Sequence, residues 1–299
     1  MPDYYVQVTP TGSGMAEIFW KVDTTVAQRC DCVPPETHQA DPGEDVLSTL
    51  RKRFPAAQFH KLQLAPGNYF PRIARPYTTR PSASPGFNPD RSPTALNIRT
   101  TSTGQLHALI QELQQICRVV HPVSANFASY GHEIRNIIII ACTEVEAHWK
   151  NVLKANDITR KTNTHDYAKL SKPMRLGEYR VALPWYPWLD PIAPFENWAP
   201  SNAPSQDLPW YDAYNHIKHD RETNFGKATL LNALKAVTGC FVMLCAQYGW
   251  DFARRGEAAA EVFFLLTDVP NWTPSEIYIP SFGAPEIARP YPFGSGGAD

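Results

Sequence analysis

The sequence contains no run of about 18 to 20 uncharged apolar residues, which a membrane-spanning helix requires. The isoleucine-rich stretch from Ile137 to Cys142 is soon interrupted by Glu144 and Glu146. The start, Met1-Pro-Asp, also lacks the basic and then apolar pattern of a signal peptide. We therefore expect a cytoplasmic, globular protein with no membrane partner.

Several catalytic signatures are missing as well. There is no glycine-rich phosphate loop, no Gly-x-Ser-x-Gly nucleophile elbow and no internal repeat of about 20 to 50 residues. His216 and His219 are three apart, but a zinc site needs three or four converging ligands. The pattern Glu144-Val-Glu-Ala-His148 also differs from the His-Glu-x-x-His motif of metalloproteases. Metal-dependent hydrolysis is therefore the weaker alternative, and we predict no metal and no cofactor.

Charge is unevenly distributed, although the net charge is only −1. Between Arg51 and Thr100 nine basic residues face one acidic residue, Asp90, so this segment carries +8 and the remainder −9. Such a segment either neutralises the protein's own acidic surface, the interpretation we favour, or recruits an anion such as RNA. Six cysteines are present, and four of them lie in apolar helical stretches, so no disulfide is expected.

The first part of the chain favours β-structure. Tyr4 to Val8 and Met15 to Val22 are aromatic and β-branched runs separated by a turn sequence, which indicates a hairpin in a small β-rich piece, residues 1–65. Seven prolines between Pro66 and Pro93 then break regular structure. We interpret residues 66–103 as a basic linker or a surface wrap.

Helical periodicity follows in residues 104–250. The apolar stripes predict helices from Gln105 to Val120, from Ala125 to about Ala155 and from Gly226 to Tyr248, with a shorter helix from His165 to Lys172 capped by Asn163 or Thr164. Between Pro184 and Trp210 lie seven prolines and four tryptophans, whose rings either cover the open side of the bundle or form a stacking platform for bases. Residues 251–299 are expected to be a C-terminal extension with one strand-like run, Val262 to Thr267, and a poorly ordered tail. The predicted fold class is therefore mainly α, a helical bundle with a small N-terminal β-containing extension.

The most informative stretch is Trp210 to Arg221. If it is helical from Asp212 onward, Asn215, Lys218 and His219 lie at positions i, i+3 and i+4 on one face. An imidazole can move a proton near neutral pH, while Lys218 and Arg221 can stabilise a phosphate's negative charge. These groups suit metal-independent RNA cleavage by a 2′-hydroxyl, and the competing structural interpretation is a solvated helix end paired with nearby acids.

This stretch resembles the HEPN superfamily of helical domains. The resemblance rests on Asn215-His-Ile-Lys-His219 followed by Asp220-Arg221, before a long apolar helix and after the isoleucine-rich helix with Glu144 and Glu146, and it covers about residues 124–248. Active family members carry Arg-polar-x-x-x-His. Here the polar residue matches Asn215 and the histidine matches His219, but Tyr214 occupies the arginine position.

The resemblance implies an up-and-down helical bundle that forms a homodimer and cleaves RNA without metal in bacterial stress, toxin or antiviral-defence systems. Since the phenol of Tyr214 lacks a permanent positive charge, the leading interpretation is binding of RNA or a nucleotide without cleavage. Two alternatives remain open: an active metal-independent endoribonuclease, and a non-catalytic interaction module for a dimer or a partner protein in a defence or toxin complex.

Other residues complete the candidate site. In the catalytic version His219, Asn215, Lys218 and Arg221 act on the RNA, while Tyr214 and His216 are candidate ligand contacts. Arg135 and Asn136 either line the same groove or belong to an exposed first helical turn. Glu144 and Glu146 flank an apolar stripe, so we expect a partly buried carboxylate that pairs with Arg221 or Lys218.

Overall fold

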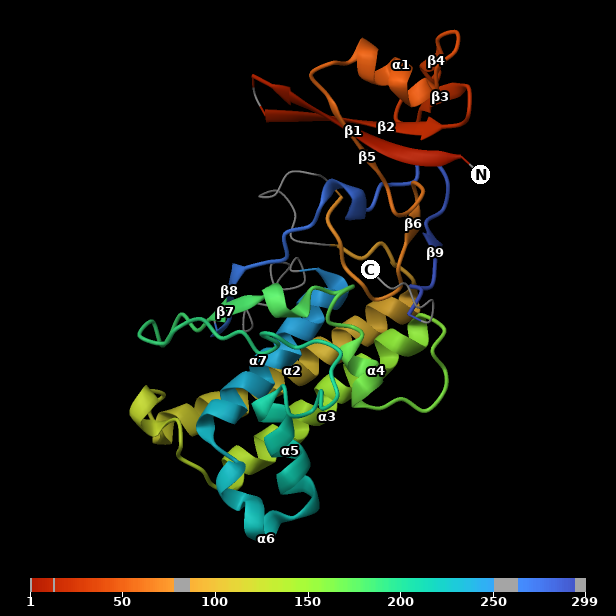
Figure 1. Ribbon diagram of the computed structural model, residues 1–299. Coiled ribbons are helices and arrows are strands. Elements are labelled where there is room, and N and C mark those ends of the chain that lie inside the picture. The colour runs from red at the N-terminus through yellow and green to blue at the C-terminus, as the bar shows by residue number, and fades with distance from the viewer. Residues whose placement is uncertain (1, 13, 78–86, 250–262, 294–299) are drawn as a thin grey trace. The chain divides into compact units, whose positions relative to one another are not determined.

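The computed structural model describes residues 2–12, 14–77, 87–249 and 263–293 (Figure 1). The chain divides into two compact units. The sheet unit comprises Met1–Tyr69, Arg75–Pro89 and Asn271–Arg289, and the helical unit comprises Phe70–Ala74, Asp90–Pro270 and Pro290–Asp299. Each unit therefore combines segments that are distant in the sequence.

The sheet unit is built on five antiparallel strands in the order β4-β3-β2-β1-β5. Its elements are β1 (Asp3–Thr11), β2 (Gly14–Val22), β3 (Val26–Arg29), β4 (Thr37–Gln39), α1 (Val46–Arg53), β5 (Gln58–Lys61), β6 (Asn68–Tyr69), the 3₁₀ turn η4 (Pro274–Glu276) and β9 (Ile287–Ala288). The predicted hairpin is confirmed as β1 and β2, which pair with Tyr5 opposite Trp20. The strands β3 to β5 have only three or four residues each, too few for sequence alternation to reveal them.

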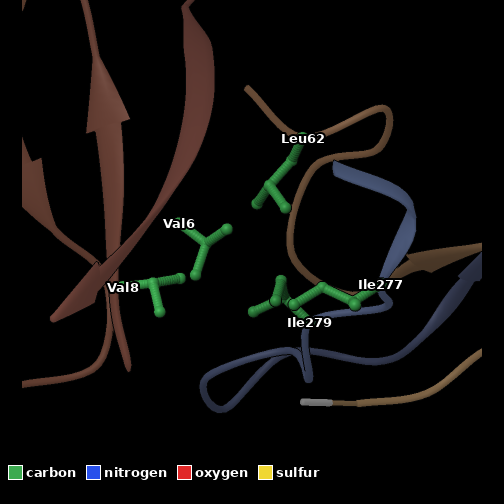
Figure 2. Packing of buried hydrophobic residues seen from close by; sticks show 5 residues of the cluster. All are labelled: Val6, Val8, Leu62, Ile277 and Ile279. Atoms are coloured by element: carbon green, nitrogen blue, oxygen red, sulfur yellow. The ribbon is translucent and has the colours of Figure 1, made fainter. Parts of the chain in front are cut away.

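Side-chain alternation along β1 and β2 gives this sheet two apolar faces. On one face Val6 and Val8 pack with Leu62, Ile277 and Ile279, as Figure 2 shows. On the other face Trp20 and Ala27 of the sheet pack with Val46 and Leu50 of α1. The C-terminal segment around Ile277 is thus part of the core of the sheet unit.

The helical unit contains the longest helices. Its elements are α2 (Pro93–Val119), η1 (Ser124–Asn126), α3 (His132–Ala155), α4 (Thr164–Ala168), η2 (Leu176–Glu178), β7 (Arg180–Ala182), α5 (Pro209–His219), α6 (Arg221–Asn224), η3 (Phe225–Lys227), α7 (Leu230–Tyr248) and β8 (Leu265–Asp268). The helices α2, α3 and α7 lie side by side, and α5 packs against both α3 and α7 (Figure 1). The short strands β7 and β8 pair antiparallel.

The helix α7 forms the centre of this core. Most of its residues are fully buried, including the polar side chains of Thr238 and Gln247, which donate hydrogen bonds to backbone carbonyls one turn earlier. Among the described residues α7 alone has the length and hydropathy of a membrane-crossing helix, and 83% of that apolar window is buried inside the protein. A core helix meets the same two criteria, so they do not place α7 in a membrane.

The predicted helices are present, with different boundaries. The helix expected from Gln105 begins at Pro93, because Ser92 caps it by accepting a hydrogen bond from the Ala95 amide and proline suits the first helical position. Residues 93–103 are therefore helical and do not belong to a linker. The expected cap of the short helix is confirmed as Asn163, which forms a reciprocal capping box with Asp166.

The sequence predicted a mainly α fold with a small N-terminal β-containing extension. The N-terminal β-structure and the helical part are confirmed, but the chain as a whole is mixed α/β, with a five-stranded antiparallel sheet followed by a mainly helical part. The strand-like run begins at Leu265 as β8, and Val262 lies outside the described residues. Of the expected poorly ordered tail, residues 294–299 also lie outside them. All six cysteines are free thiols.

Candidate functional site

The helix α5 carries most of the polar cluster. Its buried stripe consists of Trp210, Tyr211, Ala213, Tyr214 and Ile217, which repeat at helical spacing. The remaining positions carry the polar residues: Asn215 is half-buried, and His216, Lys218 and His219 are exposed. The predicted grouping of Asn215, Lys218 and His219 on one helix is therefore present.

The side chain of Lys218 is fixed by Tyr214, one turn earlier. Its Nζ donates a hydrogen bond to the Tyr214 hydroxyl at 2.8 Å and lies 4.9 Å from the centre of the same ring. Tyr214 is only 1% exposed, so its buried side chain gives the Lys218 ammonium group a fixed acceptor. The hydrogen bond to Tyr214 raises the pKa of Lys218, and the negative charge of Glu146 adds to the effect. Lys218 is thus an exposed, positioned cation.

Another hydrogen bond of the site connects α5 to α3. The Tyr211 hydroxyl donates to Oε1 of Glu146 at 2.7 Å, and Lys150 lies 3.9 Å from Oε2 of the same carboxylate. Burial raises the pKa of Tyr211, and its hydrogen bond to Glu146 raises it further. Among the described residues Glu146 therefore pairs with Tyr211 and Lys150 and not directly with Lys218. The side chain of Arg221, the other expected partner, lies outside the described part.

The remaining carboxylate, Glu144, is half-buried, and this burial raises its pKa. No ion pair of Glu144 occurs within the described residues. It therefore does not join the α5 cluster through a direct contact with Lys218.

The two histidines of α5 differ in their surroundings. His216 lies 3.4 Å from Asp212, one turn earlier. For His219 and Asn215, the part of the chain that the structure describes offers no side-chain hydrogen bond. The backbone of Arg221 begins α6, but its side chain lies outside the described part. Nothing described therefore orients the imidazole that a catalytic mechanism would need.

Arg135 and Asn136 lie at the beginning of α3. Nη1 of Arg135 donates to Oδ1 of Asn136 at 3.5 Å, a long hydrogen bond. Asn136 lines a cavity of about 710 Å³ between α2 and α3, together with Tyr130 and Ile116. None of the residues 215–220 lines this cavity. The structure thus brings Asn136 next to α2 and does not join it to the α5 cluster.

The tryptophans of the proline-rich segment divide into two pairs. Trp198 and Trp210 are buried around Trp149 of α3, with the rings of Trp149 and Trp198 stacked at 4.8 Å. Trp185 and Trp188 are each about half exposed, and Trp188 donates to the Pro122 carbonyl. The first pair therefore covers the bundle, as the structural interpretation predicts.

Sequence reasoning missed one group of charges in the helical unit. Lys150 and Lys154 lie one turn apart on α3, and Arg160 and Lys161 follow in the next loop; all four line one small cavity. The spacing of four between the lysines, followed by an adjacent basic pair, was the available signal. Within the described residues no group of three or more potential metal-ligating side chains is found.

No protein-family model, curated protein or solved structure matches this chain.

Proposed function

We propose that the helical unit binds RNA or a nucleotide at the exposed end of α5, through Lys218, His219 and Asn215. The observation that carries the proposal is the hydrogen bond that holds Lys218 on the hydroxyl of Tyr214. A lysine that is already positioned loses less side-chain entropy when it binds a phosphate. Its raised pKa keeps it charged throughout the neutral range.

The resemblance to the HEPN superfamily supports the same proposal. Under it, α3, α5 and α7 belong to a divergent HEPN-like bundle, and Asn215 and His219 retain two motif positions. Tyr214 replaces the arginine, but Lys218 supplies a cation one turn further along the helix. On this proposal the protein acts in a bacterial stress, toxin or defence system, as a homodimer or with a partner protein.

Binding is favoured over cleavage. A general acid or base must be positioned within hydrogen-bond reach of its proton, usually by a third group. His219 is exposed and has no described partner that would orient it, and the buried Tyr214 lacks the permanent positive charge of the motif arginine. The metal-independent endoribonuclease therefore remains the alternative that experiment must exclude.

The direct test uses the full-length protein with a labelled single-stranded RNA in excess EDTA. We expect binding by fluorescence anisotropy and no cleavage on a denaturing gel. Lys218→Ala should weaken binding, while Lys172→Ala should not, because Lys172 is exposed and lies outside the α5 cluster.

The outcomes separate the functions. If no RNA binds at protein concentrations up to about 100 µM, the weak end of non-specific nucleic-acid binding, the proposal is wrong and an interaction module becomes the better interpretation. Cleavage that survives EDTA but is lost in His219→Ala would establish the endoribonuclease instead.

A further inference from the structure

A small basic cavity lies at the C-terminal end of α3. It has a volume of about 320 Å³, and Lys150, Lys154, Arg160 and Lys161 contribute four positive charges to its wall. Its other lining residues include Asn151 and Thr162, and no carboxylate is among them. Ligand cavities commonly have volumes of about 300 to 1,000 Å³, so the space is sufficient for a small polar group.

The acidic groups near this cavity leave much of its charge uncompensated. Arg160 forms a two-pronged ion pair with Asp166, at 2.5 and 2.9 Å, which fixes its guanidinium. Lys150 has a longer contact with Glu146, at 3.9 Å. Asp157 lies on the same loop, but it does not line the cavity. No ion pair of Lys154 or Lys161 occurs in the part of the chain that the structure describes.

A purely structural role accounts for only part of the positive charge around the cavity. A lysine in the last turn of a helix is favourable because the helix C-terminus carries partial negative charge, which suits Lys154. Arg160 in the following loop is accounted for by its ion pair with Asp166, whereas neither explanation applies to Lys161. Four cations around one cavity repel each other, and an anion would relieve the repulsion.

The cavity is linked to the α5 cluster through Glu146. This carboxylate lies between Lys150 on its own helix and Tyr211 on α5, and its charge also acts on Lys218. From Glu146 to Lys154 the rise along α3 is about 12 Å, at about 1.5 Å per residue. Lys150 and Lys154 therefore follow Glu146 along one face of α3, one and two turns after the carboxylate that acts on Lys218.

We propose that this cavity holds a backbone phosphate of the same RNA strand that α5 binds, so that the ligand is a single-stranded oligonucleotide and not a mononucleotide. The inference rests on the proposed function, because Lys218 binds one part of the strand. Lys154 and Lys161 contact the phosphate, and the salt-bridged Arg160 provides a fixed wall. Lys150 exchanges its weak contact with Glu146 for the ligand, since exposed ion pairs of this kind contribute little stability.

The salt dependence of binding tests this directly. The logarithm of the binding constant for single strands falls with the logarithm of the salt concentration by about 0.7 for each phosphate contacted. With a labelled RNA of about 16 nucleotides, at the long end of known single-strand site sizes, Lys154→Ala should reduce the slope by about 0.7. Because both lysines contact the same phosphate, the double variant Lys154→Ala, Lys161→Ala should reduce it by about the same 0.7 and no further. Lys172→Ala is the matched control and should keep the parent slope.

A second probe, adenosine monophosphate, reports on α5 alone. We expect Lys218→Ala to weaken its binding and the double cavity variant to bind it like the parent, which also shows that this variant is folded. If the cavity variants keep the parent slope on the long RNA while Lys218→Ala reduces it, the inference is wrong and the proposed function stands. If Lys218→Ala leaves both probes unaffected, the α5 site and the continuous strand are both wrong.

Discussion

The hydroxyl of Tyr211 donates a hydrogen bond of 2.7 Å to the Glu146 carboxylate and thereby joins α5 to α3. Glu146 is mostly buried, with its side chain 20% exposed, and Tyr211 is almost completely buried. The same tyrosine packs edge-on against Trp149, in the aromatic core. The helix that carries the candidate site is thus held in place by one charged hydrogen bond and by its buried rings.

The substitution Tyr211→Phe removes this hydrogen bond and keeps the ring. A hydrogen bond to a charged group contributes about 1.5 to 3 kcal/mol, and here the carboxylate would remain partly buried. We expect the free energy of unfolding to fall by an amount in that range, measured by urea denaturation followed by circular dichroism. Tyr130→Phe is the control, because the Tyr130 ring is 58% exposed and its hydroxyl can reach solvent. Equal midpoints for parent and Tyr211→Phe would contradict the assignment.

Tyr214→Phe tests whether Tyr214 positions Lys218. The ring remains to fill its buried site, so the fold should be retained, but Lys218 loses its acceptor. We expect about two- to tenfold weaker RNA binding, the equivalent of one lost hydrogen bond of about 0.5 to 1.5 kcal/mol.

A double-mutant cycle distinguishes positioning from a general structural effect. If Tyr214 acts through Lys218, then Tyr214→Phe in a Lys218→Ala background should weaken binding no further. Additive losses would mean that Tyr214 acts independently of the lysine.

His148 gives the helical unit a pH dependence. It lies in α3 with 4% of its surface exposed, and burial, assisted by the positive charge of Arg72, lowers its pKa to about 3. The unfolded chain binds a proton near the ordinary value of about 6.5, whereas the folded chain does not. The stability is therefore complete above about pH 6.5 and decreases as the pH falls towards 3, by about 1.4 kcal/mol for each pH unit.

The substitution His148→Gln removes this titration. We expect the slope of unfolding free energy against pH, between pH 6 and 4.5, to be smaller in His148→Gln than in the parent by about 1.4 kcal/mol per unit. Carboxylates common to both proteins cancel in this comparison. His165→Gln, the same substitution at an exposed position, is the matched control. Parallel curves for parent and His148→Gln would show that His148 is accessible to protons in the folded state.

The sequence reveals the helical part of the fold more readily than the sheet. Long apolar stripes predict α3 and α7 because every buried residue contributes to the same periodic signal. By contrast, β4 has three residues, and its place beside β3 depends on pairing that no local pattern encodes. The joining of Ile277 to the core of the sheet unit is likewise a long-range contact.

The candidate site shows the same division. The shared helical face of Asn215, Lys218 and His219 follows from local spacing, and the structure has it. The partners of the charged groups depend on which helix packs against which. Sequence patterns identified Glu146 as a partly buried carboxylate, but they could not show that its hydrogen-bond donor from α5 would be Tyr211 and not Lys218.

Gly104 lies inside the part of α2 that the sequence did not predict, and it tests where this helix begins. The sequence predicts that this helix begins at Gln105, but Gly104 lies inside α2 on an exposed surface, where an added Cβ would meet no atom within 4 Å. Glycine in a helix interior costs about 0.5 to 1 kcal/mol relative to alanine, too little to end a helix that is capped at Ser92. Gly104→Ala should therefore raise the free energy of unfolding of the helical unit by about that amount.

Gly249 provides the opposite case in the same unit. It ends α7 with φ of 81°, a conformation that residues with a side chain adopt only at a cost. Gly249→Ala should lower the free energy of unfolding by about 1 kcal/mol, measured by the same urea titration. For Gly104→Ala, an unchanged free energy of unfolding would contradict the prediction. It would mean that α2 begins only at Gln105, so that Gly104 lies outside the helix and the added methyl group stabilises nothing.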